Sequence, residues 1–180
     1  MRAIDIIREV IAVEGGYVND PSDSGGETNK GITERVARRG GYTAAMRNLT
    51  AADAERIYRQ LYWQPICGDA LLDYSELIAR EVYDTAVNMG VGRAAEFLQR
   101  ALNVLNNGGR HYRDLTVDGD IGPATLAALR ALLHKRGGEG EQLLYRMLNA
   151  LQGAFYVELA ERRQKDEKYI YGWYKNRVAS

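Results

Sequence analysis

A helical pattern opens the chain in the stretch Ile4-Asp5-Ile6-Ile7-Arg8-Glu9-Val10-Ile11-Ala12-Val13-Glu14. Its apolar residues recur at three and four positions, which is the spacing of one face of an amphipathic helix. Ile7, Ile11 and Glu14 share that face, and Gly15-Gly16 is expected to end the helix. An acidic side chain therefore closes an otherwise apolar stripe.

The carboxyl group of Glu14 is a candidate general acid. Burial on the apolar face would disfavour its charged form and raise its pKa, by up to ~3–5 units. The negative end of the helix dipole acts in the same direction but is worth only ~0.3–1 kcal/mol. A carboxyl group that stays protonated near neutral pH can protonate the oxygen of a glycosidic bond. If the helix end instead turns Glu14 toward water, the residue serves only solubility, and the helical spacing leaves both interpretations open.

Residues 17–49 are predicted to be irregular, because turn-forming residues are dense there. Asp20 precedes Pro21 and is interpreted as an Asx-turn residue. Asp23 is the better candidate for the second group of a glycosidase, as a base or as an electrostatic partner. Inverting enzymes separate their two carboxyl groups by ~6.5–9.5 Å and retaining enzymes by ~5–5.5 Å, and spacing along the chain does not decide between them.

Helical spacing continues through the rest of the chain and predicts an all-α fold. Thr50 and Asp53 resemble a capping box at the start of one helix, which is expected to end before Pro65. Pro123 suits the first position of another helix, which Gly137-Gly138 is expected to end. Further helices are expected at about 75–89, at 95–105 and at 144–159, with a soft domain boundary near residue 90.

The composition limits the classes of protein that fit. The 180 residues can form one domain or two small lobes, and 24 basic residues balance 24 acidic ones. A net charge of zero provides no strong attraction to nucleic acid or to an anionic membrane. The single cysteine, Cys67, cannot form an internal disulfide, so we expect a reducing compartment and a buried thiol rather than a catalytic one.

No stretch approaches the ~20 apolar residues of a membrane-spanning helix, and membrane insertion is therefore not expected. Asp5, Arg8 and Glu9 interrupt the apolar segment at the N-terminus, which argues against an ordinary signal peptide. We expect the protein to be made in the cytoplasm and to reach any substrate outside it through another export system.

Motifs in the first half of the chain resemble a known enzyme family. They are Glu14-Gly15-Gly16-Tyr17-Val18-Asn19-Asp20-Pro21, Asp23, Gly25-Gly26-Glu27-Thr28, Gly31-Ile32-Thr33, Tyr62-Trp63 and Asp84-Thr85-Ala86-Val87-Asn88-Met89-Gly90. Together they resemble the signature of glycoside hydrolase family 108. These enzymes are N-acetylmuramidases with a lysozyme-like helical fold, found as phage endolysins and as enzymes of wall remodelling and protein or toxin release.

Motifs in the second half resemble the peptidoglycan-binding domain that accompanies this family. They are Leu98-Gln99-Arg100-Ala101-Leu102, Asp118-Gly119-Asp120-Ile121-Gly122-Pro123-Ala124-Thr125 and Gly172-Trp173-Tyr174-Lys175-Asn176-Arg177. The resemblance implies a lysozyme-like muramidase lobe at 1–90 packed on a helical peptidoglycan-binding lobe at 91–180. It also implies a monomer that acts on the glycan strand and stem peptide of bacterial peptidoglycan in the periplasm, cleaving the β-1,4 bond between N-acetylmuramic acid and N-acetylglucosamine.

The resemblance also implies roles for individual residues. Glu14 occupies the family's Glu-Gly-Gly position and is expected to be the proton donor. Asp23 or Thr28 is then expected to position the attacking water, with inversion favoured. The resemblance does not transfer a second catalytic carboxylate, because some lysozyme-like enzymes work with one glutamate and a water held by other groups.

The expected substrate-binding residues are Tyr17, Thr33, Tyr62, Trp63, Asp84 and Asn88. Aromatic rings can stack on sugars, but Tyr62 and Trp63 fit a place in the core equally well. Asp84 and Asn88 share a helix side with Glu81, where they could line the cleft or anchor a loop.

The sequence gives less support to other kinds of site and reaction. An EF-hand beginning at Asp118 would place Leu129 at the position of the bidentate glutamate, and the two histidines have no zinc-site spacing, so no metal or cofactor is expected. Two alternatives to hydrolysis remain open. One is a lytic transglycosylase that also uses Glu14, and the other is a non-catalytic peptidoglycan-binding secretion factor.

Overall fold

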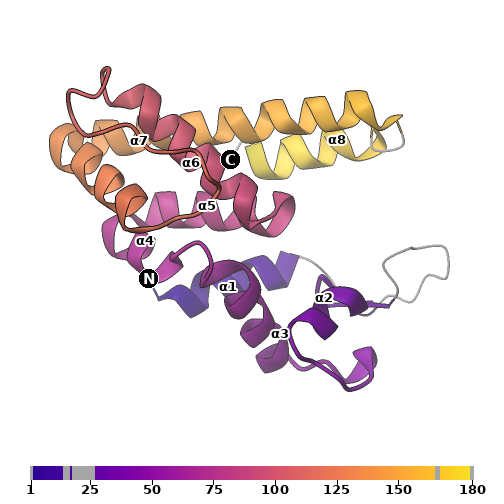
Figure 1. Cartoon of the computed structure of the whole chain (residues 1–180). Coiled ribbons are helices and arrows are strands. Elements are labelled where there is room, and N and C mark those ends of the chain that lie inside the picture. The colour runs from indigo at the N-terminus through magenta and orange to yellow at the C-terminus, as the bar shows by residue number, and fades with distance from the viewer. Residues whose placement is uncertain (1, 14–16, 18–26, 165–166, 179–180) are drawn as a thin grey trace. The chain divides into compact units, whose positions relative to one another are not determined.

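A computed structural model describes residues 2–13, 17, 27–164 and 167–178 (Figure 1). The regular secondary structure of the described residues is helical apart from one short hairpin, which confirms the predicted all-α class. The chain forms two compact units, residues 1–69 and 70–180, and each is described by itself. The division lies before residue 90 because α5 (Glu76–Met89) packs against α6 (Val91–Leu105) and α7 (Pro123–Arg162).

The first unit begins with α1 (Ala3–Val13), as the opening stretch predicts. Ile6 and Ile7 are buried, and α1 packs against α3 (Ala51–Tyr58). The Arg8 guanidinium donates to the Glu55 carboxylate across this contact, with Nε and Oε1 2.7 Å apart. Ile7, which belongs to the apolar face that comes before Glu14 in the sequence, therefore lies in the core.

A β-hairpin and a helix lie where irregular structure was predicted. Strands β1 (Thr28–Asn29) and β2 (Ile32–Thr33) are antiparallel, and α2 (Glu34–Arg39) follows them directly. Lys30 and Gly31 join the strands with φ of 53° and 72°, and two positive φ angles are what a two-residue type I′ turn requires. The irregular prediction was wrong over these residues, because two-residue strands are too short to show an alternating pattern.

The capping box at Thr50 is confirmed. The Asp53 amide donates to Thr50 Oγ1 at 3.1 Å, and the Thr50 amide donates to Asp53 Oδ2 at 3.2 Å. The helix continues from α3 into a π-helical turn, η2 (Arg59–Trp63), and so ends before Pro65 as expected. A further helix, α4 (Gly68–Tyr74), was not predicted.

The second unit is built around α5, α6 and α7, which lie side by side (Figure 1). α7 contains a break at Gly137, where φ is 55° and ψ is −145°. The predicted end of a helix at this glycine pair is therefore confirmed as a kink between two helical segments. The core of these three helices contains many aliphatic side chains, among them Ile78, Val82, Leu98, Leu102, Leu129, Leu144 and Leu148.

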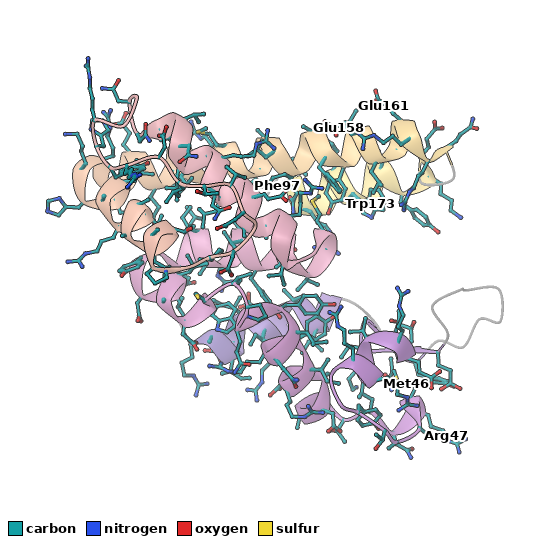
Figure 2. All side chains as sticks on the ribbon, in the orientation of Figure 1. Met46, Arg47, Phe97, Glu158, Glu161 and Trp173 are labelled. Atoms are coloured by element: carbon teal, nitrogen blue, oxygen red, sulfur yellow. The ribbon has the colours of Figure 1, made fainter. Side chains whose placement is uncertain are left out.

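The C-terminal segment returns along the end of α7. It forms α8 (Glu167–Trp173) and the π-helical η4 (Tyr174–Val178), both in contact with α7. The Trp173 ring stacks on Tyr156 of α7 with centroids 5.0 Å apart and on Tyr169 at 5.8 Å (Figure 2). Trp173 therefore anchors the tail on α7.

Gln99 of α6 holds the Asp118-Gly119-Asp120 loop. Its Nε2 donates to Asp118 Oδ1 at 2.7 Å and to the Asp120 carbonyl at 2.8 Å. Its Oε1 accepts from the amides of Asp118 and Gly119, each at 3.1 Å. These contacts give the motif a structural role.

Across the described part of the chain, the helices are too short or too polar to cross a membrane.

Candidate functional site

The two catalytic carboxylates predicted from sequence, Glu14 and Asp23, lie outside the described residues. Their roles stay predictions. Tyr17, between them in sequence, is described and is 45% exposed, so part of its ring is accessible to a sugar. The described elements that flank this segment in the sequence are α1 before it and the hairpin after it.

The hairpin brings Thr28 and Thr33 together as cross-strand partners. Directly opposed residues in an antiparallel pair project to the same face, so the two side chains are neighbours. The hairpin is held by Asn29, which is buried and whose Nδ2 donates to the Met46 carbonyl at 2.7 Å. Met46 belongs to the short helix η1 (Met46–Asn48) and is labelled in Figure 2. A fixed hairpin thus presents two threonine hydroxyls side by side.

The two threonines differ in their local contacts. Thr33 is the N-cap of α2, where its Oγ1 accepts from the Val36 amide at 3.4 Å. Its hydroxyl therefore has a structural task at the start of the helix. Thr28 lies before the hairpin turn and does not cap a helix. The role of its hydroxyl in holding the attacking water stays a prediction.

Trp63 lies in the core of the first unit. Its side chain is 0% exposed, and its Nε1 donates to Asp69 Oδ1 at 2.9 Å. A Cβ atom at Gly68 would lie 2.4 Å from the indole, so only glycine allows the chain to pass over this ring. Core packing thus accounts for Trp63, and no face of its ring is open to a sugar in this structure.

Tyr62 is half-buried beside Tyr58, with ring centroids 5.6 Å apart and planes inclined by 41°. Part of its surface stays accessible, which is compatible with sugar stacking. The role of Tyr62 therefore stays a prediction.

Asp84 and Asn88 lie in the second unit, in a network that joins three elements. Asp84 Oδ2 accepts from Gln152 Nε2 of α7 at 2.9 Å. Asp84 Oδ1 accepts from Arg177 of η4 at 3.1 Å and from Asn88 Nδ2 at 3.2 Å. Asn88 Nδ2 also donates to the Asp84 carbonyl at 2.8 Å. Asp84 thus joins α5 to α7 and η4, and cleft lining, loop anchoring or substrate contact by either residue stays a prediction.

Glu81 lies one turn before Asp84 and is 6% exposed. Burial raises the pKa of its carboxyl to about 8, the nearby charge of Asp84 acts in the same direction, and a hydrogen bond from Asn149 opposes them. Its Oε1 and the side-chain oxygens of Asn149 and Gln152 have no hydrogen-bond partner among the residues that the structure describes. We call Glu81, Asp84, Asn149, Gln152 and Arg177 the polar seam.

Most members of the polar seam were not predicted from the sequence. Asn149 and Gln152 stand three residues apart on a helix that is otherwise apolar toward the core, between Leu148 and Tyr156. Buried amides at helical spacing were the available signal, because such groups require partners on a neighbouring element. Those partners come from α5 and from the distant tail, and local spacing does not identify them.

No group of three or more potential metal-ligating side chains occurs among residues 2–13, 17, 27–164 and 167–178. The candidate groups of the first unit are hydroxyls and aromatic rings, and those of the second unit include carboxyls. Such groups can bind carbohydrate and transfer protons.

Comparisons with known proteins agree with this frame. Residues 7–90 match the family model of Glycosyl hydrolase 108, and residues 93–178 match that of a Predicted Peptidoglycan domain. The structure of SagA from Brucella abortus is similar, with a TM-score of 0.70 and 27% identity, covering 97% of this chain and 88% of that chain. No curated protein sequence gives a significant match.

These matches define a helical glycoside hydrolase with a wall-binding part. Residues 7–90 thus contain a glycosyl hydrolase 108 domain, and residues 93–178 contain a predicted peptidoglycan domain. It is a peptidoglycan hydrolase. The two family models meet near residue 90, whereas the compact units divide at residue 70, because α5 packs with the helices that follow it.

Proposed function

We propose that the chain is an N-acetylmuramidase, which hydrolyses the β-1,4 bond from N-acetylmuramic acid to N-acetylglucosamine in the bacterial periplasm. The observation that carries the proposal is the match of residues 7–90 to the Glycosyl hydrolase 108 model, a span that includes the Glu14-Gly15-Gly16 motif. The buried face of α1 supports it, because Glu14 is the next residue in sequence after this helix.

Glu14 acts as the general acid. Its proton goes to the glycosidic oxygen as the bond from that oxygen to the anomeric carbon breaks, which leaves positive charge on the muramic acid ring. Water held by Asp23 or by the Thr28 hydroxyl attacks the anomeric carbon, and its proton passes to the Asp23 carboxylate or, where Thr28 holds the water, to solvent. The products are a reducing N-acetylmuramic acid end and a free hydroxyl on N-acetylglucosamine.

Replacing Glu14 with Gln tests this assignment. The E14Q variant keeps the size of the side chain but cannot donate a proton, so clearing of purified sacculi should fall by at least a hundredfold. Glu9→Gln is the matched control, because Glu9 is an exposed glutamate on the same helix, and it should keep full activity. Full activity of E14Q would contradict the proposal.

Mass spectrometry of the released fragments separates the remaining chemistries. A muramidase adds one water to each cleaved bond and leaves a reducing end. A lytic transglycosylase, which also needs an acid, instead leaves an anhydro sugar that lacks this water. If the unaltered protein binds sacculi and releases no fragments, it is a non-catalytic wall-binding factor.

A further inference from the structure

A pocket of about 920 Å³ lies within the second unit. Its walls come from the end of α4, from the loop after α6 and from the first turns of α7. The lining includes Tyr74, His111, Leu126, Arg130, His134 and Lys135. We call it the basic pocket. It is open to solvent, and Arg130, His134 and Lys135 are exposed.

All the ionisable groups of this lining except Tyr74 are basic. Arg130 and Lys135 carry full charges, both histidines of the chain line the same pocket, and the lining contains no carboxylate. The whole chain has 24 basic and 24 acidic residues, so this excess is local. A one-signed cluster around a concave surface raises the local concentration of ligands of the opposite sign.

The positive charge of this lining comes from Arg130 and Lys135. Nε2 of His111 is buried without a hydrogen-bond partner among the described residues. The described ion pairs do not include Arg130 or Lys135. Burial lowers the pKa of His111, and the neighbouring charges of Lys135, Arg136 and Arg110 lower it further. An anion entering the pocket would therefore meet an uncompensated positive potential.

The rest of the lining is apolar. Leu126, Ala127 and Ala131 line it from α7, and Tyr74 adds a ring that is 40% exposed. A ligand that fits both the basic and the apolar parts of the lining carries carboxylates together with small aliphatic groups. A glycan strand alone does not meet this description, because its sugars are mostly hydroxylated and carry few charges.

We propose that the basic pocket binds the stem peptide of peptidoglycan, with the free carboxylates of the peptide on Arg130 and Lys135 and its alanine methyl groups on the apolar lining. The inference rests on the function proposed above, since it takes peptidoglycan as the substrate. It assigns the pocket a task separate from bond cleavage. The pocket holds the peptide branch, and the glycan is cut elsewhere.

The test is a titration of the full chain with N-acetyl-L-alanyl-D-glutamate, the first two residues of a stem peptide, followed by NMR or calorimetry. The diamide of the same compound has the same shape without the two carboxylates. We expect the acid to bind at least tenfold more tightly than the diamide. Equal affinity of the two compounds, or tighter binding of inorganic phosphate than of the acid, would overturn the proposal.

Variants locate the site. The double variant Arg130→Gln, Lys135→Gln should weaken binding of the acid at least tenfold. Arg146→Gln, an exposed arginine farther along α7 and outside the lining, should leave it unchanged. Unchanged binding in the double variant would overturn the proposal.

Activity on sacculi distinguishes the two proposals. If the protein binds the peptide but does not cleave sacculi, only the muramidase assignment is contradicted. Cleavage of sacculi without peptide binding would contradict the basic pocket alone.

Discussion

Asp84 and Arg177 are 93 residues apart in the sequence, and their side chains form an ion pair with Oδ1 and Nη1 3.1 Å apart. The side chains are 29% and 20% exposed, so the pair is largely shielded from water. It ties the tail to α5, while Gln152 ties α7 to the same carboxylate. One aspartate from the hydrolase family motif therefore holds together three helical elements.

Removing this pair should destabilise the protein. Arg177→Gln removes the positive charge that compensates the Asp84 carboxylate. We expect the free energy of unfolding to fall by about 1–3 kcal/mol. Urea unfolding measures the change. Arg162→Gln is the control, because its ion pair with Glu158 is exposed and should contribute less than about 1 kcal/mol. Equal effects of the two variants would show that shielding does not matter here.

Glu81 should make stability depend on pH. The pKa of its carboxyl is raised from 4.5 to about 8, mainly by burial, so the folded state binds the proton more tightly than the unfolded state does. Below pH 4.5 the group is protonated in both states. As the pH rises from there to about 8, the folded state loses stability relative to the unfolded state.

Glu81→Gln removes this loss. Relative to the unaltered protein, the variant should gain stability on going from pH 5 to pH 9, by about 1–4 kcal/mol. Urea unfolding at both pH values measures the gain. Glu161→Gln, an exposed residue on α7, controls for the loss of one carboxyl group. A difference that does not change with pH would contradict the raised pKa.

Gly137 and Gly138 should respond in opposite ways to alanine. Gly137 has φ of 55° and ψ of −145°, a region that alanine enters only with strain, and Gly137→Ala should cost about 1–3 kcal/mol. Gly138 has open space around it, and alanine there should be neutral or stabilise the helix by up to about 1 kcal/mol. Thermal unfolding compares the two, and equal midpoints would contradict the kink.

Much of the helical frame could be predicted because its signals are local. Thr50 and Pro123 mark helix starts through their own backbone preferences, and Gly137 marks a break. The hairpin, α2, α4 and α8 were missed, since each is too short for a period to emerge. The positive φ of Lys30 was also unforeseeable, because a lysine rarely occupies such a position.

The candidate site was less predictable, since its groups meet across the fold. Asp84 was identified as a candidate, but its partners Gln152 and Arg177 lie on elements far away in the sequence. The basic pocket likewise joins His111 to a helix that begins after it. Trp63 could be read as a sugar platform or as core, and only its packing against Gly68 distinguishes the two.

The paired threonines of the hairpin provide a test of which group positions water. Thr33 caps α2, so Thr33→Val should lower the free energy of unfolding by about 1 kcal/mol and affect hydrolysis less. Thr28 does not cap a helix, and if its hydroxyl holds the attacking water, Thr28→Val should slow sacculus hydrolysis at least tenfold with little change in stability. Hydrolysis rates and urea unfolding of both variants separate the two roles. An unchanged rate in Thr28→Val, together with a large loss in Asp23→Asn, would assign the water to Asp23 instead.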